Sequence, residues 1–167
     1  MAEPVSSAEF KAALRRFASG VTVVTCRVQD VDHAMTASAF SAVSLDPPLV
    51  LVCVNRRARF AEALGATQSW GVSILAEDGQ EAARWFATSG RPLLGQLERF
   101  DHVRGGNGAA LLGGSLATME CRTWSVQTAG DHDIVIGAVT AASIGGAGHP
   151  LVYWEAGYRR LDQRTGA

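Results

Sequence analysis

The sequence predicts a mainly β protein with short helices, arranged as a Greek-key-like barrel. Many short strand-like segments are separated by turn residues, and strands and helices do not alternate strictly. No G-x-G-x-x-G motif follows a strand and opens a helix, which disfavours a doubly wound dinucleotide-binding sheet. The chain has 167 residues, of which 47% are hydrophobic, so residues 1–167 are expected to form a single domain.

The first expected element is an amphipathic helix over residues 6–18. Its apolar side chains recur at helical spacing at Phe10, Ala13, Leu14 and Phe17. Ser6 and Glu9 form a capping-box pattern at its start, and Gly20 lies just past its end.

Two buried strands with a segment of small residues between them come next. Val21–Val28 is rich in β-branched residues, and Leu49–Val54 is an unbroken apolar run. A turn is expected at residues 30–32. The segment 34–44 mixes small, hydroxyl-bearing and apolar residues and ends at Asp46-Pro47-Pro48.

The middle of the chain predicts two short helices around one strand. Ala58–Leu64 reads as a helix closed by Gly65. In residues 69–74 apolar and small side chains alternate, which predicts a half-buried strand. Asp78 and Glu81 form a second capping-box pattern, which predicts that a helix begins there.

The C-terminal half is expected to begin with a loop-rich stretch and to continue as strands. Residues 89–114 are rich in glycine. Residues 117–122 alternate in polarity, and residues 133–144 are mostly apolar, so two long strands are expected. Leu151–Trp154 and Tyr158–Leu161 predict a final hairpin.

Composition and charge exclude several classes of function. A formal net charge of −1 gives no basis for binding nucleic acid, and no apolar run is long enough to cross a membrane. The first residues, Met1–Pro4, lack the pattern of a signal peptide. Three cysteines, widely spaced, argue against disulfides, and burial is expected for Cys26 and Cys53. The four histidines are too scattered to predict a metal site. A cytoplasmic protein is therefore expected.

The segment Thr36–Ser44 is the first candidate for a binding site. It carries four hydroxyls among small side chains, next to an expected buried strand. Short side chains allow a planar ligand to approach the backbone, and hydroxyls and amides can bond the polar edge of its ring. The alternative, which composition alone favours, is an ordinary edge strand rich in Ser and Thr.

Two polar turns are further candidates. Asn55, Arg56, Arg57 and Arg59 surround the start of an expected helix and suit a phosphate group, although a solvated basic turn is an equal alternative. His132 is flanked by two carboxylates, so it can donate hydrogen bonds or hold a positive charge near neutral pH. The alternative is a polar hairpin turn. A Ser-His-Asp hydrolase is disfavoured because no G-x-S-x-G motif is present.

Taken in order, these residues resemble the flavin reductase family, the small reductases that serve two-component flavin-dependent monooxygenases. The similarity runs from Phe10 to Leu161. The similar stretches are Phe17-x-x-Gly20-Val21-Thr22-Val23-Val24-Thr25, Met35-Thr36-Ala37-Ser38-Ala39-Phe40, Val43-Ser44-Leu45-Asp46-Pro47-Pro48-Leu49-Val50, Arg99-Phe100, Gly130-Asp131-His132 and Pro150-Leu151-Val152-Tyr153. Ala34 stands where the family often has glycine, and the loop 89–97 departs from the compact loop of many relatives.

The resemblance implies an FMN-binding type of split β-barrel that forms a homodimer. It implies reduction of FMN or FAD by hydride transfer from NADH or NADPH, and supply of reduced flavin to a partner monooxygenase. A flavin-binding storage or sensing protein without catalysis is the alternative, and a haem-binding split barrel is a more remote one.

The resemblance also implies roles for individual residues. Thr36, Ala37 and Ser38 correspond to contacts with the isoalloxazine ring, and Ser41 lies close to the ring or the ribityl chain. The basic turn falls where the family binds the flavin phosphate; its residues are Asn55, Arg56, Arg57 and Arg59. His132 and Tyr158 correspond to positions on the nicotinamide side.

Overall fold

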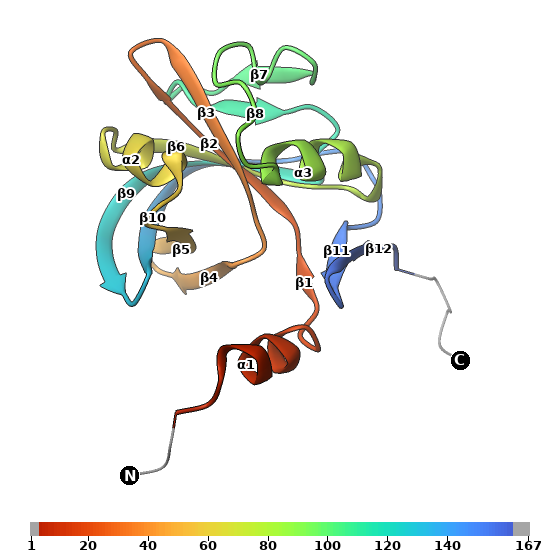
Figure 1. The fold of residues 1–167 in the computed structure, drawn as a ribbon. Coiled ribbons are helices and arrows are strands. Elements are labelled where there is room, and N and C mark those ends of the chain that lie inside the picture. Colours follow the sequence, from red (N-terminus) through yellow and green to blue (C-terminus); the bar gives the residue numbers. More distant parts are fainter. Residues whose placement is uncertain (1–3, 162–167) are drawn as a thin grey trace.

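The computed structural model describes residues 4–161, and residues 1–3 and 162–167 lie outside the described part. A curved, antiparallel, seven-stranded sheet forms the body of the protein in the order β3-β2-β6-β9-β10-β5-β4 (Figure 1). Its strands are β2 (Thr22–Val28), β3 (Val31–Ala37), β4 (Phe40–Leu45), β5 (Pro48–Asn55), β6 (Ser69–Ile74), β9 (Ala117–Ala129) and β10 (His132–Ile144). The edge strands β3 and β4 do not pair with each other, so the barrel is split, as predicted.

Shorter elements cover this sheet. The strands β1 (Ser19–Gly20), β11 (Val152–Trp154) and β12 (Gly157–Arg159) form one small sheet, and β7 (His102–Arg104) and β8 (Ala110–Leu112) form another. The helices are α1 (Ser7–Leu14), α2 (Arg59–Gly65) and α3 (Gln80–Ala87), and a single 3₁₀ turn, η1 (Glu77–Gly79), precedes α3. None of the helices among the described residues has the length and apolar character needed to cross a membrane.

Apolar residues on the two faces of β2 belong to two different hydrophobic clusters. Val24 packs in a cluster with Phe60 of α2 and with Trp70. On the other face, Val23 packs in a cluster with Phe86 of α3. Because both faces of β2 are covered, its sequence is apolar without alternation. The helices α2 and α3 therefore lie over opposite faces of β2. A cavity opens beside these helices, along the neighbouring edge strand β3.

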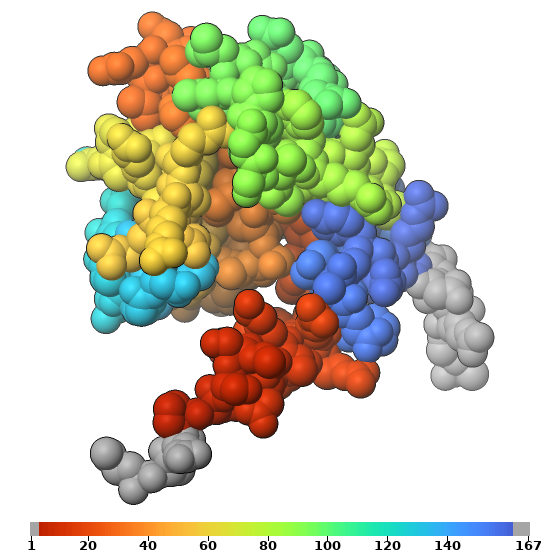
Figure 2. Space-filling view, in the orientation of Figure 1, coloured from red at the N-terminus to blue at the C-terminus, as the bar shows by residue number. Residues whose placement is uncertain are grey.

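Helix α1 begins as predicted but ends early. The Ser6 Oγ accepts a hydrogen bond from the Glu9 backbone N–H at 3.3 Å, and the Glu9 carboxylate accepts one from the Ser6 N–H at 3.1 Å. The helix ends at Leu14, and none of its residues is buried. Figure 2 shows this N-terminal segment projecting from the body, with the side chain of Phe17 74% exposed.

Three local predictions were wrong. The helix α3 has no capping box at Asp78, because η1 comes first and Gly79 becomes the N-cap residue. Strand β6 is not half-buried: residues 70–73 are buried, because β8 covers its second face, and a Cβ on Gly71 would meet Leu111 at 2.8 Å. The turn before β3 is one residue earlier than predicted, with Gln29 and Asp30 in the left-handed region.

The three cysteines are free, but only two of them are buried. Cys26 is buried as expected, and Cys121 is buried as well. Cys53 is only partly covered, because it lies on the face of β5 opposite to the buried Val52 and Val54. Burial raises the pKa of Cys26 and of Cys121 to about 12.

We expect thiol reagents to spare the two buried cysteines in the folded protein. A thiol with a pKa of about 12 is almost entirely protonated at pH 8, and the thiolate is the reactive form. Mass spectrometry after maleimide treatment should find Cys26 and Cys121 unmodified until denaturant is added. Rapid labelling of either residue under native conditions would show that its strand opens locally.

Candidate functional site

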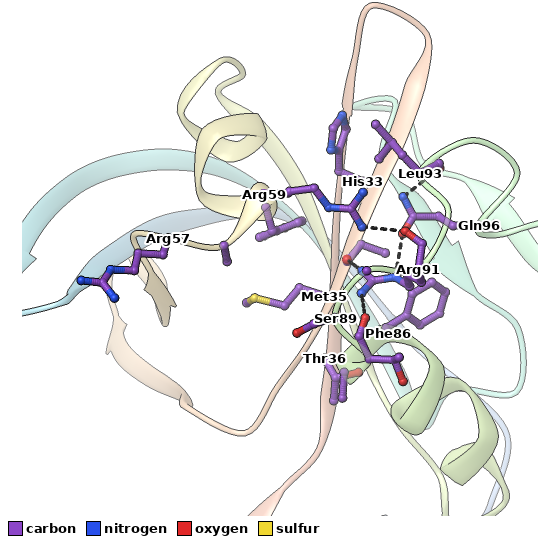
Figure 3. A pocket seen from close by; sticks show the side chains of 16 residues that line it. His33, Met35, Thr36, Arg57, Arg59, Phe86, Ser89, Arg91, Leu93 and Gln96 are labelled. Atoms are coloured by element: carbon purple, nitrogen blue, oxygen red, sulfur yellow. Dashed lines mark hydrogen bonds between the residues drawn. The ribbon is translucent and has the colours of Figure 1, made fainter. Parts of the chain in front are cut away.

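A cavity of ≈ 570 Å³ lies between β3, the start of α2 and the loop that follows α3 (Figure 3). Its lining residues are His33, Ala34, Met35, Thr36, Arg57, Ala58, Arg59, Phe60, Phe86, Ala87, Thr88, Ser89, Gly90, Arg91, Leu93 and Gln96. This set holds three guanidinium groups, and none of its members carries a carboxylate. The cavity therefore suits an anionic ligand, and its size is that of a small-molecule site.

The inner wall of the cavity is the free edge of β3. The outward carbonyl of Asp32 accepts a hydrogen bond from Gln96 Nε2 at 2.7 Å, and the outward carbonyl of Ala34 accepts one from Arg91. In an antiparallel strand the N–H and C=O of one residue point to the same side. The N–H groups of Ala34 and Thr36 therefore face the free edge and are available to a ligand.

Thr36 contributes its backbone to this wall. Its hydroxyl is already used, because Oγ1 donates to the Ala83 carbonyl of α3 at 2.7 Å. The neighbouring Met35 packs against the cluster around Trp70 and lines the same cavity. The hydroxyl-rich segment thus offers amide groups at Thr36, and the threonine side chain fixes α3 against β3.

The three arginines of the cavity have different surroundings. The guanidinium of Arg57 makes no hydrogen bond to another described residue, and Figure 3 shows it on the opposite side of the cavity from Arg91. Arg59 Nη2 donates to the Arg91 carbonyl at 2.8 Å. The Arg91 guanidinium donates hydrogen bonds to Ala34, Thr88 and Gln96. Its pKa is lowered, mainly by burial and also by the nearby positive charge of Arg59.

No sequence pattern singles out His33, Arg91 or Gln96 as site residues. His33 lies beside Arg59. Partial burial is the largest cause that lowers the pKa of His33, and the positive charge of Arg59 is the second. The negative charges of Asp32 and Glu62 oppose this shift but are weaker. Gln96 is only 3% exposed. A buried glutamine in a glycine-rich loop signals a structural hydrogen-bond role, but burial itself is not visible in the sequence.

The predicted ring-binding residues do not all face this cavity. Ala37 is buried, with its side chain in the same core cluster as Val24. Ser38 is exposed at the corner between β3 and β4 and lines a second groove. Ser41 is exposed on β4, and its hydroxyl donates a hydrogen bond to the carbonyl of its neighbour Ala42 at 3.1 Å.

The two predicted polar turns lie side by side at one end of the sheet. Asn55 pairs with His132 in the register of β5 and β10, and the Arg56 N–H donates to the Asp131 carbonyl at 3.0 Å. The Asn55 side chain accepts from the Arg57 N–H at 2.9 Å. His132 Nδ1 lies 2.7 Å from an Asp131 carboxylate oxygen, and this hydrogen bond holds the pKa of Asp131 below its usual value. Arg56 also faces Asp133, with Nε 3.8 Å from the carboxylate. These contacts join the basic turn, residues 55–59, to the turn that carries His132.

A second groove of ≈ 460 Å³ lies between α1 and the β11–β12 hairpin. It is lined by Lys11, Leu14, Arg15, Phe17, Ser19, Ser38, Ala39, Tyr153, Trp154, Glu155 and Ala156. Tyr158 lies behind this groove, with its ring edge-on to Tyr153 at 5.5 Å and beneath the Arg84 guanidinium. Ser38 and Ala39 place the groove at the end of β3, beyond Thr36.

A family model described as a flavin reductase like domain matches residues 14–162. The chain belongs to this family. One relative, the reductase component of 4-hydroxyphenylacetate 3-monooxygenase from Thermus thermophilus, is 41% identical over 152 residues, which cover 91% of this chain and 95% of the relative. An NADH-dependent flavin reductase from a Rhodococcus species is 39% identical over 95% of this chain and 88% of its own length.

Solved structures of flavin reductases have the same fold. The flavin reductase component of a bacterial two-component tryptophan halogenase superposes with a TM-score of 0.89 at 42% identity, covering 95% of this chain and 100% of that one. An NADH:FAD oxidoreductase from Streptomyces globisporus, in complex with NAD and FAD fragments, gives a TM-score of 0.91 at 33% identity, covering 99% and 100%. The resemblance and the fold class predicted from the sequence are thereby confirmed.

Proposed function

We propose that this protein is a flavin reductase that transfers hydride from NADH or NADPH to FMN or FAD. The observation that carries the proposal is the cavity at the free edge of β3, in which three arginines stand without a carboxylate. A flavin nucleotide matches both features, since its ring has a polar edge and its chain ends in phosphate. The flavin and the nicotinamide supply the redox chemistry, and the protein supplies binding and alignment.

Different parts of the site take different parts of the flavin in this proposal. The phosphate binds at the basic turn, with Arg57 as its main partner and with Asn55, Arg56 and Arg59 around it. The ring lies along the outward amides of β3, from Thr36 past Ala37 to Ser38, and Ser41 lies near its end. Tyr158 supports the nicotinamide side by packing behind Tyr153.

The proposed role of His132 is to orient the nicotinamide or to balance charge on the reduced ring. Its Nδ1 is held by Asp131, so the other ring nitrogen is free to face a ligand. We expect His132→Ala to slow hydride transfer about tenfold or more, the scale of a modest positioning or acid–base group. Stopped-flow flavin reduction measures this directly, and an unchanged rate would remove the role.

The experiment that tests the function is NADH and NADPH oxidation, followed at 340 nm, with FMN, FAD and riboflavin in parallel. Reduction of at least one flavin, absent without protein, is the expected result. The non-catalytic alternative predicts flavin binding without nicotinamide oxidation. The names of the relatives favour catalysis, since several are NADH-dependent reductases.

We also propose that reduced flavin leaves the protein for a partner flavin-dependent monooxygenase. Relatives named as reductase components of monooxygenases support this. If the purified protein keeps its flavin through extensive dialysis and turns over with the flavin bound, transfer by diffusion is the wrong picture.

A cytoplasmic homodimer is the proposed working form. Free thiols suit a reducing compartment. Large apolar side chains on β4, β9 and β10 stay exposed, with Leu45 at 93%, Trp124 at 62% and Ile144 at 88%. Apolar surface of this kind is typical of a subunit interface. Light scattering coupled to gel filtration checks the expected dimer mass.

A further inference from the structure

The loop from Thr88 to Gln96 forms the outer wall of the cavity, and two of its side chains bind it to β3. Gln96 Nε2 donates to the Asp32 carbonyl at 2.7 Å, and Arg91 Nη2 donates to the Ala34 carbonyl. Within residues 4–161, no strand pairs with this edge of β3. The two side chains therefore take the hydrogen-bonding positions that a neighbouring strand would take.

Each of the three guanidinium nitrogens of Arg91 donates a hydrogen bond to the protein itself. Its Nε donates to Gln96 Oε1 at 3.1 Å, its Nη1 donates to the Thr88 carbonyl at 2.9 Å, and its guanidinium lies 5.6 Å from the centre of the Phe86 ring. The Gln96 amide group uses both of its hydrogens, because Nε2 also donates to the Leu93 carbonyl at 3.1 Å. All three nitrogens of the Arg91 guanidinium and both amide hydrogens of Gln96 are thus engaged with the loop and with β3.

The same loop is tied to the opposite wall of the cavity. Arg59 of α2 donates to the Arg91 carbonyl at 2.8 Å, so the position of the Arg59 guanidinium depends on where Arg91 holds the loop (Figure 3). Just before Arg91, Ser89 and Gly90 face the cavity, and Gly90 is in the left-handed region with φ 76°. A shift of the loop would move Ser89 and Arg59 together.

We propose that Arg91 and Gln96 form a latch that positions the flavin-phosphate end of the cavity without touching the flavin. Arg91 is thus a positioning residue, although it is one of three arginines lining an anion site. This inference rests on the proposed function only for the identity of the ligand. The anchoring of the loop on β3 is a property of the protein alone.

The two possible roles of Arg91 predict different results. If Arg91 bound the phosphate through its charge, Arg91→Lys would keep most of the affinity and Gln96→Leu would have no effect. If Arg91 acts through the latch, both variants must weaken binding, because an ammonium cannot reproduce three bonds in fixed directions. Once one partner is lost, the loss of the other should change the affinity very little, so the double variant should bind flavin about as well as either single variant.

The test compares Arg91→Lys, Gln96→Leu and the double variant in two measurements. Steady-state kinetics should show KM for FMN raised about tenfold in each, the scale of one hydrogen bond to a charged group, with kcat changed much less. Hydrogen exchange without flavin should be faster in peptides covering residues 88–96 and unchanged in β9. The matched control is Arg27→Met, which removes a charge whose ion-pair partner is the exposed Asp30 at 3.1 Å.

The outcomes separate the latch from the function. Wild-type KM and exchange in either Arg91→Lys or Gln96→Leu would overturn the latch, as would additive losses in the double variant. If one variant fails to fold, the other still decides between the two roles. If the wild-type protein oxidises no nicotinamide with any flavin, the proposed function fails, and the exchange measurement still tests the loop anchoring.

Discussion

Arg57→Ala should raise KM for FMN and FAD by roughly 10- to 100-fold and leave KM for riboflavin nearly unchanged. Arg57 is the cavity arginine whose guanidinium has no hydrogen-bond partner among the described residues, so its donors are free for a phosphate. A hydrogen bond between charged groups contributes about 1.5–3 kcal/mol, which corresponds to this change in affinity. Riboflavin lacks the phosphate and so should not detect the loss.

Two variants serve as references for Arg57→Ala in the same NADH oxidation assay. Arg56→Ala is expected to have a smaller effect, because the Arg56 side chain already faces Asp133. Arg27→Ala removes an equal charge outside the cavity and should not alter KM. An equal rise in KM for riboflavin and FMN in Arg57→Ala would mean that Arg57 acts on the ring or on the fold.

Gly137→Ala should strongly destabilise the fold, because the added methyl group would collide with the buried Trp70 side chain. A Cβ at Gly137 would lie 2.9 Å from Cε2 and 3.1 Å from Cη2 of Trp70, and nearer still to Cζ2. Trp70 is fully buried between β2 and β9 and cannot move aside. Overpacking of this kind costs about 3 kcal/mol, which lowers the melting midpoint of a domain of this size by roughly 6–12 °C.

A second substitution distinguishes a clash with Trp70 from a general intolerance of β10. Trp70→Phe removes the outer ring that the new methyl group would meet, and it breaks no side-chain hydrogen bond, because Nε1 has no partner among the described residues. The double variant should therefore be more stable than the sum of the single effects predicts. Gly65→Ala is the control, since its Cβ meets no atom within 4 Å. Additive losses in thermal unfolding would contradict the proposed clash.

Features that depend on nearby residues were predictable from the sequence. The capping box of Ser6 and Glu9, the buried strand around Val52 and the long pair β9 and β10 follow from local pattern and from turn residues. The half-buried prediction for β6 failed because β8, which covers it, lies about 40 residues further along the chain. No periodicity within β6 carries that information.

Some residues of the binding site were likewise predictable from local sequence, and others were not. The basic turn and the segment at Thr36 stand out by composition, and the structure places Arg57, Arg59 and Thr36 around one cavity. Arg91 and Gln96 were missed, because they occur in a loop whose two glycines and single proline predict only irregular structure. Their importance comes from hydrogen bonds to an edge strand that lies 57 and 64 residues earlier in the chain, and only the fold brings these segments together.

The edge of β3 also bears on which molecules the protein admits. A strand with free N–H and C=O groups invites another polypeptide to extend the sheet, which is a common route to aggregation. Here the carbonyls of Asp32 and Ala34 already accept hydrogen bonds from the side chains of the loop. The backbone N–H groups of an incoming strand would therefore find these two acceptors occupied. A small planar molecule needs only the remaining N–H groups. The cavity can thus stay open to a flavin while the same edge resists self-association of the protein.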